Sequence, residues 1–298
     1  MFIFTIIHYL ILYDYHAKRK RYRGKAARFY DIIADMLEFI RLARKRGKVA
    51  DVFHDLFDLA FATLTVLLVI IFPDTPWPAL ALLLLSKWRM IAVRPRYWWV
   101  NIVSALPDLA FGAAIVILIW LSGQNAVASG GWALPVQIIC GLIYAAWLIG
   151  LKPRDDKKSV LWQAGLAQFV AGVAIFDLAG RLPLAVIMVL AFVVAFGSAW
   201  QVLGQFEETE RTPLALIYGF LVMSISFAAW HWTVGYAVTP LLEIPQASII
   251  IAALGFGVVK LYDAHMTSGI KWSSVGWPLV ASGAIIVLVT FIGGGLFV

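Results

Sequence analysis

Long apolar runs separated by short polar stretches occupy the chain from about residue 53 onward. Nine runs have lengths that suit a bilayer, at 53–72, 77–93, 99–121, 133–151, 159–179, 183–204, 213–237, 246–262 and 276–297. An α-helix needs about 20 apolar residues to cross roughly 30 Å of hydrocarbon. The pattern therefore predicts an all-α, polytopic transmembrane helical bundle with about nine spans.

The first two runs are the weakest of the nine. Pro73 ends the first one early, and Lys87 and Arg89 interrupt the second. If residues 53–93 form one re-entrant pair in place of two full spans, seven helices cross and both ends of the chain keep their sides. The hydrophobic pattern leaves these two alternatives open.

The composition supports a membrane protein. Hydrophobic residues make up 62% of the chain, charged residues only 14%, and the mean hydropathy is +0.87. Soluble domains typically carry about 25% charged residues. The single cysteine, Cys140, excludes an intramolecular disulfide and a thiolate metal cluster.

Basic residues are distributed so that one face of a membrane could hold almost all of them. Of the 24 lysines and arginines, all but Arg181 fall before or between the apolar runs on what would be a single side. Cytoplasmic loops carry such an excess of Lys and Arg. We therefore predict a cytoplasmic N-terminus and an extracytoplasmic C-terminus, with a bacterial inner membrane as the preferred location.

Two domains are predicted, a basic arm at 1–50 and a transmembrane helical domain at 51–298. The arm contains the run KRKRYRGK (Lys18–Lys25) and then an apolar stripe at helical spacing, which indicates an amphipathic helix on the cytosolic surface. The bilayer itself is one expected partner. Anionic inner-leaflet lipids are a second, bound through residues 18–48. No nucleic-acid partner is expected, and the pattern leaves the oligomeric state open.

Four helical hairpins follow one another at 77–121, 133–179, 183–237 and 246–297, each turning on the cytosolic side. Tryptophans flank several of these turns. Such hairpins are either parallel repeats, as found in transporters, or ordinary cytosolic turns with their usual aromatic and basic residues. Within them, Ala164, Ala167, Ala171 and Ala174 form a small-residue face that should pack closely on a neighbouring helix.

Several stretches resemble known membrane proteins. SKWRMIAVRPRYWWVN (Ser86–Asn101), KPR (Lys152–Arg154), FEET (Phe206–Thr209) and His231-Trp232 resemble an uncharacterised family of multispanning proteins from reduced-genome bacteria. That resemblance implies a polytopic fold and no known activity. RPRYWWVN (Arg94–Asn101) is also similar to the segment that opens the first helix of UbiA-type prenyltransferases. Those enzymes chelate magnesium through aspartate-rich motifs, and no NDxxDxxxD occurs here, which disfavours that chemistry.

Asp108 is the deepest acidic residue of the predicted bundle. Asn101, Ser104 and Asp108 recur at i, i+3 and i+7, which places Asp108 about 13 Å from the cytosolic end of its span at 1.5 Å per residue. An aspartate at such depth costs on the order of 3 kcal/mol on insertion scales. Gln168 and Ser224 lie at comparable depth in other spans. These five residues are predicted to form an ion- or substrate-binding cluster, or else a protonated Asp108 joins helices by hydrogen bonds.

A second candidate site lies at the start of the first span. Asp51, His54, Asp55 and Asp58 occupy one helical face, where they could hold a metal ion or form an acidic interfacial surface that pairs with nearby basic residues. Asp177 and Arg181 are predicted to form an ion pair. No catalytic residue is assigned, and no cofactor is expected because the sequence has no nucleotide-binding motif and no suitably placed pair of haem-ligating histidines.

Two classes of function fit these patterns. The favoured one is transport or membrane organisation, with the polar residues around Asp108 handling a small ion or an apolar solute. The alternative is a lipid-modifying enzyme that works at the cytosolic face. Its candidate residues are the acidic loop positions Asp155, Asp156, Glu207, Glu208 and Glu210.

Overall fold

The computed structural model describes residues 56–90, 92–124, 131–232, 234–239, 242–267 and 269–295. The basic arm at 1–50, and with it the predicted amphipathic helix and its lipid contacts, lies outside the described residues. The contacts described below belong to one compact unit that begins at Phe57.

Helices dominate the described residues, which confirms the all-α prediction. They are Leu56–Ile71, α3 (Trp77–Ser86), α4 (Trp98–Gln124), α5 (Ala133–Ala146), α6 (Lys157–Asp177), α7 (Leu184–Gly204), α8 (Arg211–Trp232), α9 (Gln246–Thr267) and α10 (Trp272–Gly295). Two short 3₁₀ turns, Trp88–Met90 and Pro95–Tyr97, lie between α3 and α4, and a π-helical turn, Trp147–Leu151, continues α5. Within the described residues, six helices are long and apolar enough to cross a membrane, which suggests an integral membrane protein.

Two predicted runs end earlier than the hydrophobic pattern indicated. The run at 77–93 is wrong as a continuous helix, because α3 ends at Ser86 and irregular chain with two 3₁₀ turns follows. The run at 213–237 ends at Trp232, and β1 (Gly235–Thr239) then pairs antiparallel with β2 (Leu242–Pro245). β-branched and aromatic residues such as Tyr236 and Val238 suit a strand as well as an apolar helix, so hydropathy alone did not separate them.

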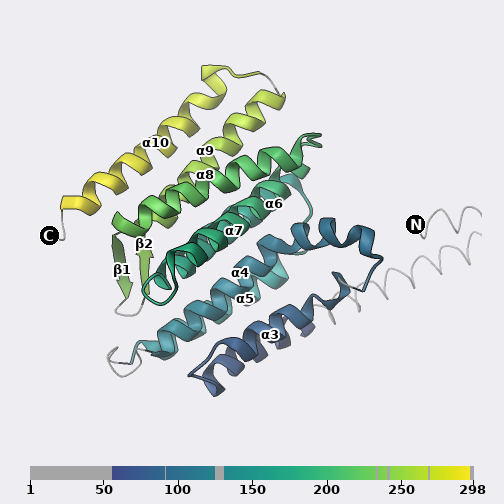
Figure 1. Cartoon of the computed structure of the whole chain (residues 1–298), viewed down its shortest axis with the longest axis vertical. Coiled ribbons are helices and arrows are strands. Elements are labelled where there is room, and N and C mark those ends of the chain that lie inside the picture. Colours follow the sequence, from purple (N-terminus) through teal and green to yellow (C-terminus); the bar gives the residue numbers. More distant parts are fainter. Residues whose placement is uncertain are drawn as a thin grey trace, which may run out of the picture. The chain divides into compact units, whose positions relative to one another are not determined.

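α6 lies at the centre of the helix packing (Figure 1). It contacts α4, α7 and α9, while α5 and α3 pack on α4, α8 packs on α7 and α10 packs on α9. The predicted small-residue face of α6 is confirmed as a buried surface, since Ala164, Ala167, Ala171 and Ala174 are all buried. Small side chains let these helices approach closely, as is usual between transmembrane helices.

α3 runs beside only about half of α4. Its preceding turn lies at the C-terminal end of α4, where Trp120 Nε1 and Gln124 Nε2 donate to the Pro73 carbonyl at 2.9 and 2.5 Å. Its C-cap residue, Lys87, contacts Asp108. Ten helical residues rise about 15 Å. Irregular chain connects the end of α3 to Trp98 at the start of α4. Because α3 ends where it does, Lys87 lies beside Asp108.

Candidate ion-pair site around Asp108

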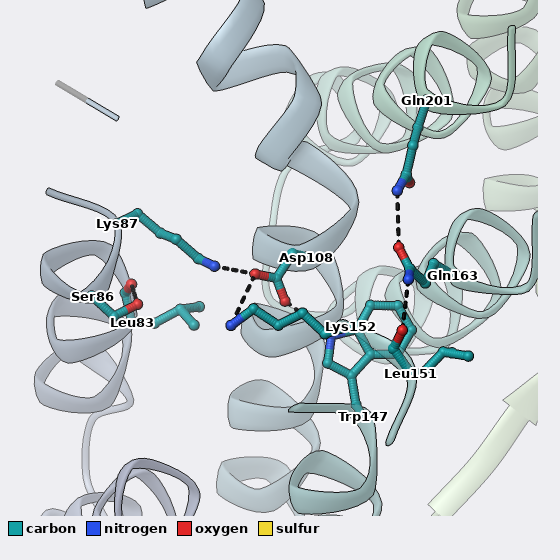
Figure 2. Close-up of polar contacts among 9 residues, drawn as sticks. All are labelled: Leu83, Ser86, Lys87, Asp108, Trp147, Leu151, Lys152, Gln163 and Gln201. Atoms are coloured by element: carbon teal, nitrogen blue, oxygen red, sulfur yellow. Dashed lines mark hydrogen bonds and ion pairs between the residues drawn. The ribbon is translucent and has the colours of Figure 1, made fainter. Parts of the chain in front are cut away.

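Three polar side chains from two segments, the end of α3 and the π-turn after α5, converge on Asp108 (Figure 2). Lys87 Nζ is in direct contact with Asp108 Oδ2, and Lys152 Nζ lies 3.7 Å from the same oxygen. Trp147 Nε1 donates a hydrogen bond to the other oxygen, Oδ1, at 2.9 Å. We call Lys87, Asp108, Trp147 and Lys152 the Asp108 cluster.

The π-helical turn places Trp147 and Lys152 on the same side of α5. The Lys152 backbone N–H donates to the Trp147 carbonyl at 2.9 Å, an i to i+5 bond in place of the α-helical i to i+4 bond. Residues five apart in an α-helix point about 140° away from each other. The wider turn reduces that angle, so both side chains reach one carboxylate. Single π-turns inside α-helices frequently occur at functional sites.

Close packing holds the helices of the cluster together. The rings of Phe111 and Trp147 stack with centroids 3.9 Å apart and an angle of 10° between their planes. A Cβ on Gly112 would lie 2.8 Å from Leu83 Cδ1 and 3.2 Å from the Tyr144 hydroxyl oxygen. A side chain at position 112 would therefore require the Leu83 side chain and the Tyr144 hydroxyl to shift.

The cluster is mostly shielded from solvent, and Lys152 is its most accessible member. The side chains of Lys87 and Asp108 are 16% and 18% exposed, against 33% for Lys152. Lys152 is the first residue beyond the apolar segment Ala133–Leu151. Burial lowers the pKa of its amine below 10.5, and Lys87 lowers that pKa further, while Asp108 partly opposes the change.

A further carboxylate lies near the cluster. Asp58, on the helix Leu56–Ile71, is 5% exposed, and its charge acts on both Lys152 and Tyr144. It is the one member of the predicted metal set that the structure describes. Asp51, His54 and Asp55 lie outside the described residues, so that metal site stays a prediction. Within the described ranges, no group of three His, Cys, Asp or Glu side chains could hold a metal ion.

The other predicted members of the Asp108 site do not join it through polar contacts. Gln168 is buried and donates to the Tyr218 hydroxyl at 2.8 Å. Ser224 is exposed and donates to the Phe220 carbonyl of its own helix. Ser104 is also exposed, and Asn101 is half-buried. The prediction found the central carboxylate and missed the two lysines and the tryptophan that contact it.

Lys87 and Lys152 were missed because their charge had placed them in cytosolic loops. Lys87 in particular was grouped with Arg94 and Arg96, whose side chains are exposed. A signal was present in the sequence, since Lys87 interrupts an apolar run at a depth where a partner is needed. Only the contact between α3 and α4 identifies that partner as Asp108.

A glutamine network fixes the segment that carries Lys152 (Figure 2). Gln163 Nε2 donates to the carbonyls of Leu151 and Arg154 at 2.7 and 2.9 Å, and Gln201 Nε2 donates to Gln163 Oε1 at 3.0 Å. These bonds join the end of α5 to α6 and α7. The backbone on both sides of Lys152 is therefore held.

Two of the acidic loop residues, Asp156 and Glu208, have structural partners. Asp156 caps α6 by accepting from the Ser159 backbone N–H at 3.1 Å, and the side chain and backbone of Ser159 together lower the pKa of the Asp156 carboxyl. Glu208 accepts from the Tyr262 hydroxyl, which lowers the pKa of that carboxyl. A nearby ion pair joins Lys157 Nζ to Asp263 Oδ1 at 2.7 Å.

The predicted ion pair between Asp177 and Arg181 is wrong. The Arg181 guanidinium carbon lies 4.9 Å from the centroid of the Trp120 ring, and no ion pair within 4.0 Å joins Arg181 to Asp177 in the described part of the chain. Arg181 follows the end of α6 at Asp177, and the turn directs its side chain toward α4. A cation over an indole face has a favourable interaction of its own.

Comparison with family models, curated proteins and solved structures finds no match to this chain. The resemblances to the reduced-genome family and to UbiA-type prenyltransferases therefore stay predictions.

Proposed function

We propose that this protein is an integral membrane transporter for a small ion or small solute, with the Asp108 cluster as its coupling site. The observation that carries the proposal is the end of α3 at Lys87, directly beside the Asp108 carboxylate. Transporter sites are typically formed by helices that break within the bilayer beside polar groups. Here one helix ends at the cluster and the π-turn of a second supplies two further contacts.

Irregular backbone supports the same function. Backbone that leaves the helix within a bilayer is tolerated where it is buried in protein or lines a water-filled cavity. The described chain from Lys87 to Tyr97 starts beside Asp108 and returns to the start of α4, and because its residues are mostly exposed, our proposal assigns it to the second of these cases. We propose nine passes, of which the second consists of α3 and this irregular segment.

The lysines give the site two alternative arrangements. Asp108 Oδ2 contacts Lys87 and lies 3.7 Å from Lys152, so a small displacement of the lysine side chains would exchange its partner. A transporter needs such a two-state element, whose balance a ligand or a proton can shift. An ion pair with one fixed partner would hold the helices together without this property.

The enzyme alternative has no comparable support. Asp156 and Glu208 serve local structure, as a helix cap and as the acceptor for Tyr262. No set of described acidic residues has the geometry for a metal ion. Transport is therefore the function that the described residues favour.

Reconstitution tests the proposal. Purified protein in liposomes on a solid-supported membrane should give transient currents, or a change in the fluorescence of lumenal pyranine, after at least one jump in protons, sodium, chloride, acetate or inorganic phosphate. Asp108→Asn should abolish the signal. Asp263→Asn is the matched control, because it removes a carboxylate paired with Lys157 outside the cluster and should keep it.

Two results would count against the proposal. Wild-type liposomes that respond like protein-free liposomes to every jump would remove the case for transport of these ions. An Asp108→Asn protein with wild-type signals would show that the cluster is not the coupling site. Size-exclusion chromatography of both variants before reconstitution separates loss of transport from loss of folding.

A further inference from the structure

Lys152 is a largely buried cation whose amine makes no hydrogen bond to a protein acceptor among the described residues. Its Nζ atom lies 3.7 Å from Asp108 Oδ2, which is beyond hydrogen-bond distance. That oxygen already contacts Lys87, and Trp147 occupies Oδ1. An ammonium group has three N–H donors. Those of Lys152 therefore remain available for a further acceptor.

We propose that Lys152, with Lys87 behind it, forms a binding site for a small oxyanion, a group of carboxylate or phosphate chemistry. The inference rests on the proposed function in that it names the substrate class of the same cluster. The anion would accept hydrogen bonds from the Lys152 ammonium on its exposed side. Hydrogen bonds between ionised donors and acceptors are about twice as strong as neutral ones.

The accessible side of Lys152 defines the approach to this site. Lys152 is 33% exposed, whereas Lys87 and Asp108 are 16% and 18% exposed, so an anion reaches Lys152 first. Lys152 follows the last residue of the π-turn and precedes the α6 helix, so its exposed side belongs to the end of α5 where Gln163 fixes the loop. On the predicted orientation, that end faces the cytoplasm.

Asp108 is the internal competitor of the bound anion. The charged groups that act on Lys152 are Asp108, Lys87 and Asp58, in decreasing order. While Asp108 stays paired with Lys87, its carboxylate interacts with Lys152 only at 3.7 Å and therefore weakly. An external oxyanion can then replace Asp108 as the partner of Lys152. If Lys87 is removed, Asp108 is free to pair with Lys152 and should compete more strongly with the anion. The two lysines thus have different roles.

This competition gives expected changes of opposite sign. Lys152→Gln should weaken anion binding at least tenfold, and Lys87→Gln should weaken it less. Asp108→Asn should strengthen it about tenfold or more, because two unit charges 3.7 Å apart interact by several kcal/mol at an effective dielectric constant of about 20. If anions bound only through nonspecific attraction to a basic protein, Asp108 would not compete with them for Lys152.

Thermal unfolding of the purified, delipidated full-length protein in detergent measures the binding. A ligand that binds only the folded state raises its stability in proportion to the logarithm of ligand concentration over Kd. The probes are inorganic phosphate, acetate and dihexanoyl phosphatidylglycerol, each titrated at constant ionic strength. Lys158→Gln is the matched control, since this exposed lysine lies in the same loop and should leave binding unchanged.

The outcomes decide between the sources of the oxyanion. Stabilisation by phosphate or acetate that is lost in Lys152→Gln supports a free anion. Stabilisation by the phospholipid alone, also lost in that variant, supports a lipid headgroup at the same site. No shift in the wild type, or shifts that persist in Lys152→Gln, would overturn the proposal.

Two further measurements keep the test independent of folding and of transport. Lys152→Arg retains the charge and should retain binding, and the unfolding temperature without anion shows whether each variant folds. Anion binding without transport signals in liposomes would leave the site standing and remove the transport function. Transport signals without anion-dependent stabilisation would leave the transport function standing and remove the anion site.

Discussion

At the scale of single residues, Asp108 is defined by its two ammonium partners. The sequence had offered either a ligand site or a neutral carboxyl group joined to other helices by hydrogen bonds. The structure adds Lys87 and Lys152, which neither alternative included. Removing one partner of a buried ion pair leaves the other charge uncompensated, and this usually costs about 3 to 5 kcal/mol.

A double-mutant cycle on Lys87 and Asp108 tests this pairing. Asp108→Asn keeps the size of the side chain but leaves both ammonium groups without their anion, so we expect a loss of about 3 kcal/mol in the free energy of unfolding. Lys87→Met in the Asp108→Asn background should recover part of that loss. The measurement is reversible unfolding in mixed micelles. The exposed pair Lys157–Asp263 is the control, with an expected coupling of about 0.2 to 1 kcal/mol. A coupling for Lys87 and Asp108 that is no larger would contradict the assignment.

The pKa of Lys152 gives a second prediction at this scale. Burial lowers it in the folded protein, so the unfolded chain holds more protons between the folded pKa and the ordinary value of 10.5. The contribution of Lys152 to stability should therefore rise with pH across that window. Asp108→Asn should lower the pKa of Lys152 further and Lys87→Gln should raise it. The pH dependence of amine acylation, followed by mass spectrometry, measures both directions. A midpoint at or above that of lysine in an unstructured peptide would refute the prediction.

At the scale of elements, close approaches between helices decide which side chains meet. α4 carries Asp108 and packs on α7, where a Cβ on Gly197 would lie 2.5 Å from Leu106 Cβ. Because Leu106 Cβ is fixed to its backbone, the helices themselves would have to move apart. Gly165 of α6 has no neighbour within 4 Å of its would-be Cβ. The two glycines therefore form a matched pair.

Gly197→Ala should destabilise the protein by about 1 to 3 kcal/mol, as overpacking does in well-packed interiors. Gly165→Ala should be neutral or stabilise it by up to about 1 kcal/mol, because alanine is the better helix former. Unfolding temperatures of the two variants in the same detergent compare them directly. Equal effects of the two substitutions would show that α4 and α7 are not in the contact described.

At the scale of the whole molecule, the charge distribution predicts which loops face the cytoplasm. Cysteines for labelling must be exposed, and positions 155, 180, 209 and 238 all are. In a Cys140→Ala background, cysteines at Gly180 or Val238 should react with an impermeant maleimide from outside intact cells. Cysteines at Asp155 or Thr209 should react only after permeabilisation. Labelling of the second pair in intact cells would reverse the orientation.

The sequence by itself determined the helices and most of their limits. Apolar runs of about 20 residues between basic turns correspond to α4 to α10, because burial of backbone polar groups in an apolar environment leaves the helix as the available conformation. The alanine stripe of α6 was also readable, since it depends only on helical periodicity. The position of Asp108 needed no tertiary information either.

Only the tertiary structure decided which groups share a site with Asp108. Lys87 and Lys152 lie 21 residues before and 44 residues after it, and charge patterning had placed both in loops. The end of α3 at Ser86 and the π-turn at Trp147–Leu151 bring them to one carboxylate. Lys87 interrupts an apolar run, but hydropathy does not show which group it meets, because that depends on how α3 and α5 pack against α4. Local periodicity determines the secondary structure of a segment, whereas contacts between elements determine which group pairs with a buried charge.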